Sequence, residues 1–440
     1  MMRFAPSVGI AILAVASWPS VAAAQLSFER PPIRYSQTEP TGPVALLKAS
    51  IDAGSVAIAS DEDHGYLAEL LAELKIPVDS QTLVFSKTSL QKHRISPQTP
   101  RAIYFNDDVY VAWTPGAELI EIASTDPQLG SVFYTVDQQQ DPQQPVEITR
   151  RVHRCLFCHG STDTGRVPGL LMQSVFTDED GHRAFPSDSI EPKASGPLLG
   201  RWGGWYVSGT QGNQRHLGNL RTDSASKVTK ESLVATANVT SLEEFFDTSK
   251  YLSPHSDVVA LLVLQHQVTL HNLLTSANQR TRLRMHGEKM ESDATQISDE
   301  DGLFLDQIAE EVVDGLLMVD QPSWEDTIAG SSGFATEFEN RGPFDSRGSS
   351  LRRLDLKQRL FQYPCSYLIY SDAFDRLPQP LLQRVYRRLH EILRGTNVVP
   401  KYSYLSHEQR SAIEAILVET KPAVAKAFAA IDSESEDADE

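Results

Sequence analysis

Two periods of hydrophobic residues follow one another along the chain. Between residues 101 and 136, apolar and polar side chains alternate in short runs with turn residues between them, which is typical of antiparallel strands. The polar turn at 106–108 joins the first two runs and predicts a hairpin. Apolar residues that recur every three or four positions predict helices at 66–74, 257–282, 302–318, 380–394 and 406–419. We therefore expect an α+β fold, with a small antiparallel β meander in the N-terminal part and mainly helical parts after it.

Local signals mark the ends of two helices and two irregular segments. Ser406 and Gln409 have the spacing of a capping box at a helix start, and Gly395 stands where a left-handed residue ends a helix. Residues 25–45 are rich in Pro, Ser and Thr, and we expect an extended leader there. The acidic and serine-rich residues 432–440 predict a disordered tail.

The N-terminus has the layout of a secretory signal peptide, with Arg3 before an apolar run at 8–16 and small residues before Gln25. We expect cleavage near Ala24 and a periplasmic or secreted protein. No transmembrane segment is expected, because no later run reaches the roughly 18 apolar residues that span a bilayer. The expected segments are a signal peptide (1–24), an N-terminal α+β domain (25–145), a cofactor-binding region (146–286), a helical C-terminal region (287–430) and a disordered acidic tail (431–440).

The most specific chemical signal is a Cys-x-x-Cys-His motif formed by Cys155, Cys158 and His159. In an exported chain this motif is typical of covalent c-type haem attachment. Two thiols on one helical turn are placed to bond the two vinyl groups of a haem, and the adjacent histidine binds the iron as its proximal axial ligand. The sequence therefore predicts one covalent haem c. A second such motif and a His-Glu-x-x-His zinc motif are both absent from the sequence, so neither a di-haem enzyme nor a zinc hydrolase finds support.

The residues after the motif are rich in Gly and Pro, as expected for loops around a flat cofactor. We expect Trp202 and Trp205 to pack against the macrocycle, and Arg201 or Arg215 to pair with a haem propionate. The alternative is that these are ordinary core tryptophans and solvated arginines.

The sixth position of the iron separates electron transfer from small-molecule chemistry, because a strong axial ligand blocks access to the metal. Our first candidate for this distal ligand is His216, which lies in a Gly-rich loop, and the second is His266, on the apolar face of the helix at 257–282. Met172, among apolar residues behind the motif, is the third. His271 lies about 140° around the helix from His266, so the two are not expected to bind one iron. An open or water-bound site is the remaining alternative.

Charge and cysteine content narrow the classes of partner. The formal net charge of −18 argues against nucleic acid or an anionic membrane surface, and it suits a basic periplasmic redox partner. General solubility explains the charge equally well. The third cysteine, Cys365, has no second cysteine outside the motif to pair with, so we expect no structural disulfide and a buried, unreactive thiol.

The haem motif is accompanied by Val167-Pro168-Gly169 and by further runs at 201–209, 216–219, 264–267 and 363–370. With these runs the chain resembles a large family of exported bacterial proteins that contain a cytochrome c domain. The resemblance covers most of the mature chain and implies a monohaem c-type protein much larger than a simple electron carrier. It implies no particular reaction, and it supports His216 and His266 alike.

Three functional hypotheses follow. The first is electron transfer in the periplasm, which we favour because one attached haem without another catalytic cluster is typical of an electron carrier. The second is a haem-dependent oxidoreductase or peroxidase-like enzyme with an accessible iron, which the size of the chain favours. The third is a haem-based sensor or binding module.

Overall fold

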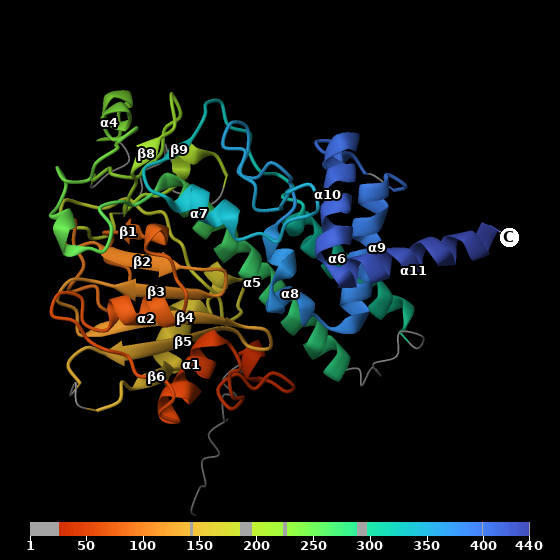
Figure 1. Cartoon of the computed structure of the whole chain (residues 1–440), viewed down its shortest axis with the longest axis horizontal. Coiled ribbons are helices and arrows are strands. Elements are labelled where there is room, and N and C mark those ends of the chain that lie inside the picture. Colours follow the sequence, from red (N-terminus) through yellow and green to blue (C-terminus); the bar gives the residue numbers. More distant parts are fainter. Residues whose placement is uncertain are drawn as a thin grey trace, which may run out of the picture.

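The computed structural model describes residues 26–140, 144–184, 196–222, 227–287, 297–397 and 399–439. The predicted signal peptide lies outside this range. A seven-stranded antiparallel sheet with the order β6-β5-β4-β3-β2-β1-β7 occupies the N-terminal half (Figure 1). Its strands are β1 (Thr82–Val84), β2 (Arg101–Phe105), β3 (Val109–Trp113), β4 (Leu119–Asp126), β5 (Gly130–Asp137), β6 (Ile148–Arg151) and β7 (Trp205–Tyr206).

The α+β prediction is confirmed, and so is the hairpin, in which Phe105 of β2 pairs with Tyr110 of β3. The sheet is larger than the predicted meander, because β6 and β7 come from beyond residue 145 and join it. A strand of only two residues, such as β7, carries too little periodicity to be recognised in a sequence. The sheet therefore crosses the predicted boundary between the first two segments.

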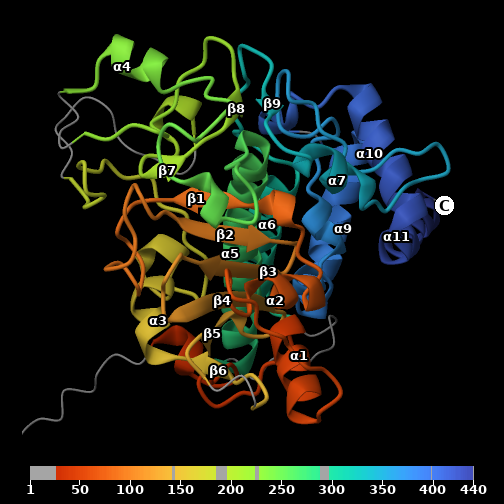
Figure 2. The same ribbon diagram turned by 60° about the vertical axis from the view of Figure 1, so that its left-hand side comes forward.

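Both faces of the sheet are covered. Tyr104, Val111 and Ile122 point to one face, where they share an apolar core with α1 (Pro43–Asp52) and α2 (Leu67–Glu73). Phe105 and Tyr110 point to the other face and belong to the core around α5 (Val258–Gly287). In Figure 2, α2 lies in front of the sheet and α5 behind it.

The N-terminal segment is not the extended leader that its composition predicts. Phe28 lies in the short 3-10 helix Ser27–Glu29, and Phe28, Ile33 and Tyr35 are fully buried. The Tyr35 hydroxyl donates to the carbonyl of Ser131 over 2.8 Å. Burial of these scattered apolar side chains holds the segment against the sheet, and this tertiary effect has no local signal.

Helices make up the C-terminal half. They are α6 (Asp299–Leu316), α7 (Phe334–Asn340), α8 (Asp372–Asp375), α9 (Gln379–Arg394), α10 (His407–Thr420) and α11 (Pro422–Asp439). The predicted helices at 302–318, 380–394 and 406–419 are confirmed within a few residues, as is the capping box of Ser406 and Gln409. By length and composition alone, α5 is long and apolar enough to cross a membrane. However, 72% of its most apolar window is buried inside the protein, as in a core helix.

We predicted a disordered tail from residue 432, whereas the structure describes α11 as continuing to Asp439. Asp432 lies 2.9 Å from His390 Nε2 and 3.3 Å from Arg394 Nη2, and both partners belong to α9. Asp432 therefore faces basic side chains that are distant in sequence, which composition alone does not reveal.

Two glycines should respond in opposite ways to replacement by alanine. Gly395 ends α9 at a φ of 78°, so Gly395→Ala should lower the free energy of unfolding by about 1 kcal/mol through backbone strain. Gly302 lies inside α6, where a Cβ would meet only Arg384 Nη2 at 3.6 Å. Gly302→Ala should therefore raise the free energy of unfolding by about 0.5 to 1 kcal/mol. Urea titration of both variants measures these changes, and a shift in the same direction for both would contradict the assignment.

Candidate functional site

The Cys-x-x-Cys-His motif folds as the short helix α3 (His153–His159), directly after β6. Cys158 and His159 lie three and four positions after Cys155, so one side of the helix carries both thiols and the imidazole. Leu156 is buried in the sheet core, whereas the Phe157 side chain is 86% exposed. Cys155 is half-buried and Cys158 is exposed. The motif is thus presented at the surface beside the sheet, as Figure 2 shows.

One hydrogen bond sets the orientation and the proton position of His159. Its Nδ1 lies 2.9 Å from the carbonyl oxygen of Gly169. A carbonyl only accepts hydrogen bonds, so Nδ1 carries the proton and Nε2 keeps its lone pair. Burial lowers the pKa of His159 to about 4, so the ring is neutral near pH 7. The imidazole is therefore in the form in which Nε2 can bind a metal.

The central helix α5 anchors the backbone that orients His159. The amide of Gly169 donates to the carbonyl of His159 over 2.8 Å. The side chain of Asn272 accepts from the Leu170 amide and donates to the Leu170 carbonyl, both over 2.8 Å. A Cβ on Gly169 would lie 2.4 Å from Asn272 Oδ1, so only glycine permits this approach. α5 thereby fixes the position of the carbonyl that holds the imidazole.

The sheet places a charged pair beside α3 that sequence reasoning missed. Arg101 of β2 and Glu121 of β4 point to the same face, and Arg101 Nη1 lies 2.9 Å from Glu121 Oε2. Burial is the main cause of the high pKa of Cys155, about 11, and the charge of Glu121 adds to it. Burial also accounts for most of the low pKa of His159, and the charge of Arg101 contributes. Both charges therefore lie close to the motif.

Each member of this pair has one buried polar atom without a hydrogen-bond partner, namely Arg101 Nε and Glu121 Oε1. Buried polar atoms in native proteins nearly always have a partner. The pair therefore leaves one donor and one acceptor for a group bound beside α3. These two atoms, the thiols on one side of α3 and the free Nε2 of His159 together fit a covalently attached haem.

Among the residues expected to contact the cofactor, Trp205 lies on this face of the sheet. Trp205 and Arg101 both pair with Val84 of β1, so the three side chains point the same way. The Trp205 indole donates to the carbonyl of Gln173 over 2.7 Å. Trp205 therefore remains a candidate for packing against a bound group.

Trp202 and Arg201 lie elsewhere. The Trp202 ring is buried with its centroid 5.4 Å from that of His216. Arg201 donates to the carbonyl of Gly196 and, over 3.4 Å, to Gln265 Oε1. Neither residue bonds to α3 within the described ranges.

The three candidate distal ligands occupy three different environments. His216 is 1% exposed, and its Nδ1 has no hydrogen-bond partner. His266 Nε2 lies 2.7 Å from the hydroxyl of Ser366, and Met172 packs in the apolar cluster around α5. No hydrogen bond or ring contact joins any of the three to α3 in the part of the chain that the structure describes. The distal ligand therefore stays a prediction. As expected, His271 faces away from His266, with its Nε2 2.8 Å from the carbonyl of Asp107.

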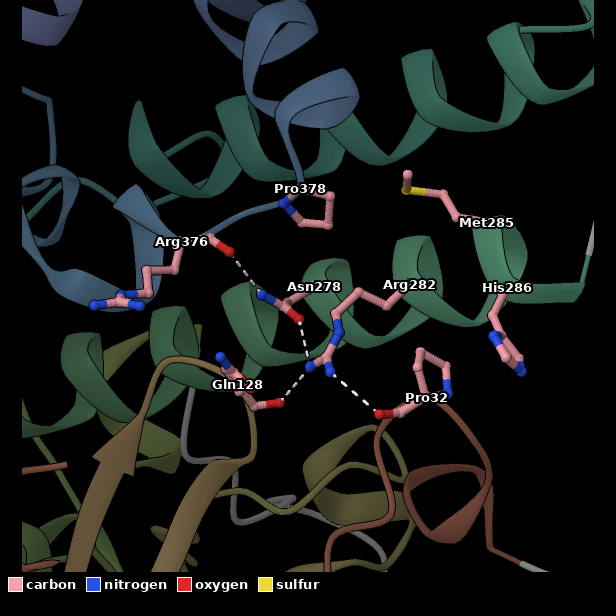
Figure 3. Close-up of a pocket in the computed structure, with 8 residues that line it drawn as sticks. All are labelled: Pro32, Gln128, Asn278, Arg282, Met285, His286, Arg376 and Pro378. Carbon is pink, nitrogen blue, oxygen red and sulfur yellow. Dashed lines mark hydrogen bonds between the residues drawn. The ribbon is translucent and has the colours of Figure 1, made fainter. Parts of the chain in front are cut away.

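Two cavities adjoin α5. The first, of about 440 Å³, lies near its C-terminal end (Figure 3). There Arg282 donates to the carbonyls of Gln128 and Pro32, and Asn278 donates to the carbonyl of Arg376. These polar groups form hydrogen bonds with one another, so the contacts join α5 to the neighbouring loops. The second cavity, of about 210 Å³, contains Arg201 and His266. Neither cavity is lined by a residue of α3.

The third cysteine, Cys365, lies away from the motif in the protein core. Cys365 is fully buried, and burial raises its pKa to about 12, which confirms the prediction of a buried thiol. Among the described residues, no group of three or more His, Cys, Asp or Glu side chains is placed to hold a metal ion.

No family model, curated protein or solved structure matches the chain. The resemblance to exported proteins with a cytochrome c domain therefore stays a prediction.

Proposed function

We propose that the chain is a monohaem c-type cytochrome that transfers electrons in the periplasm. The observation that carries the proposal is the hydrogen bond between His159 Nδ1 and the Gly169 carbonyl. A histidine that ligates a metal usually donates its other ring N–H to a carbonyl or a carboxylate, which fixes its tautomer. Here the same histidine directly follows two cysteines on one helical turn. A bound haem would supply a one-electron ferric–ferrous couple at this position.

In this proposal, the chain positions the cofactor through three sets of residues. Cys155 and Cys158 would hold the cofactor covalently, and His159 Nε2 would bind its iron. Arg101 takes the role that we expected of Arg201, because its Nε is unpartnered and its charge acts on His159. We expect Arg101 to pair with a carboxylate of the cofactor.

The surface position of α3 favours electron transfer over catalysis. Cys158 and Phe157 are both exposed, so a redox partner could approach the haem on the side where it would be attached. The net charge of −18 suits a basic partner through electrostatic steering.

Expression together with a cytochrome c maturation system tests the proposal. After denaturation the polypeptide should retain haem, because thioether bonds survive unfolding. The native protein should show a low-spin spectrum that carbon monoxide and cyanide leave unchanged. Loss of all haem on denaturation would refute covalent attachment, and rapid binding of carbon monoxide would instead indicate a haem-dependent oxidoreductase. Separate replacement of His216, His266 and Met172 then identifies the distal ligand as the residue whose loss gives a high-spin spectrum.

A further inference from the structure

The 210 Å³ cavity lies between the middle of α5 and the end of α6. Gln265, His266 and Thr269 line it from α5, and residues 318–322 line it from the segment that follows α6. Arg201 reaches it from the loop before β7. The other lining side chains are largely apolar and include Leu262, Leu270, Leu273, Trp324 and Leu360. The cavity thus has a polar end and an apolar body.

Arg201 brings a positive charge into this cavity without a negative partner. Its Nε and Nη2 both donate to one carbonyl, that of Gly196, over 2.8 and 2.5 Å. The guanidinium forms no ion pair with any residue in the described ranges. Asp314, an acid of the same cavity, is bonded to Lys401 and Tyr402 instead. A buried charge normally has a partner, so the guanidinium has capacity for an anion.

His266 lines the same cavity as Arg201. Its Nε2 lies 2.7 Å from the hydroxyl of Ser366, which also accepts from the Leu368 amide. Gln265 and Thr269 add two neutral polar side chains from the same helix. A second acid of the lining, Asp320, is exposed to solvent. Among the described residues, Arg201 is therefore the one cation of the cavity wall, beside neutral polar side chains of α5.

The backbone of the opposite wall is held in an unfavourable conformation. Met318 has a φ of 61° at the end of α6, where the Val319 amide donates to the carbonyl of Asp314 and the Met318 amide donates to that of Gly315. This is a Schellman motif, whose left-handed position favours glycine. Methionine there costs about 1 kcal/mol, but it places a side chain that is only 7% exposed on the cavity wall. Strain of this kind is concentrated at ligand sites.

We propose that this cavity binds a small organic monocarboxylate with an apolar body. Arg201 pairs with the carboxylate, Gln265 and His266 surround that end, and the leucines and Trp324 take the apolar part. No residue of α3 lines the cavity.

Calorimetric titration of the mature protein with sodium benzoate tests the proposal, with benzamide as the neutral analogue of the same shape. Benzoate should bind at least about tenfold more tightly, because a charge-assisted bidentate hydrogen bond is worth more than a neutral one. Equal affinity for the two compounds, or no heat from benzoate, would overturn the proposal.

Two variants locate the binding. Arg201→Gln should weaken benzoate binding at least about tenfold and leave benzamide binding unchanged. Its matched control is Arg215→Gln, because Arg215 donates only to the nearby carbonyls of Gly212 and Gln214. Thr269 is exposed on α5 at the cavity, so Thr269→Trp should block binding without a change in the unfolding midpoint, even if Arg201→Gln fails to fold. Unchanged benzoate affinity in Thr269→Trp would contradict the location.

Discussion

Replacing Arg352 by methionine should lower the free energy of unfolding by about 2 to 3 kcal/mol, because it removes the buried partner of an ion pair whose carboxylate is partly exposed. Arg352 is 5% exposed and forms a bidentate pair with Asp107 in the turn between β2 and β3. Its guanidinium also lies 4.1 Å from the Tyr367 ring centroid and donates to the carbonyl of Gly342. This side chain therefore joins the sheet to the C-terminal half, and its loss leaves the Asp107 carboxylate without its main partner.

Urea unfolding of Arg352→Met and of Arg353→Met measures the effect against a neighbouring control. The Arg353 side chain is 42% exposed and lies 3.8 Å from Glu339, so its replacement should change the free energy by less than about 1 kcal/mol. Adding Asp107→Asn to Arg352→Met should recover part of the lost stability, because the stranded charge is then gone. Equal effects of Arg352→Met and Arg353→Met would show that the buried pair contributes little.

Replacing both Cys155 and Cys158 by alanine should abolish covalent haem retention. The two thiols are the attachment points in the proposed function, and the sequence has only one further cysteine. Cys365→Ala is the control, because that thiol is fully buried and should leave haem attachment intact. Intact-protein mass spectrometry after maturation and denaturation measures the attached haem. A haem-sized mass increase in the double variant would contradict attachment through these cysteines.

Periodicity predicted the elements whose side chains repeat on one face. α9 and α10 appeared within a residue or two of their predicted bounds, because Leu389 and Ile413 belong to regular apolar stripes. Phe28 and Tyr35 lie in irregular backbone instead, and only the sheet above them reveals their burial. Acidic residues of the tail likewise meet their basic partners on α9 only after folding.

The residues of the candidate site also fall into those that the sequence predicted and those that only the fold brings together. Cys155, Cys158 and His159 are neighbours in sequence, so their spacing alone placed them on one side of a helix. Arg101 and Glu121 belong to separate strands, and only the register of the sheet brings them together beside α3. In each of these strands a charged side chain stands on a face whose other residues are largely apolar. Two opposite charges in such positions were the signal from which the pair could have been predicted. Likewise, Arg201 and His266 line the same cavity only because the loop before β7 packs on α5.

The short strand β7 has a consequence for the order of assembly during synthesis. Strands β1 to β6 pair mainly with neighbours in sequence, but the outer edge of β1 is closed by Trp205 and Tyr206 and by the hydroxyl of Ser256, which accepts from the Leu83 amide. Until those residues emerge, β1 presents unpaired amides and carbonyls, which are a template for association with other chains. A fragment that ends before residue 205 would therefore keep an open edge, and the complete chain removes this aggregation hazard by itself.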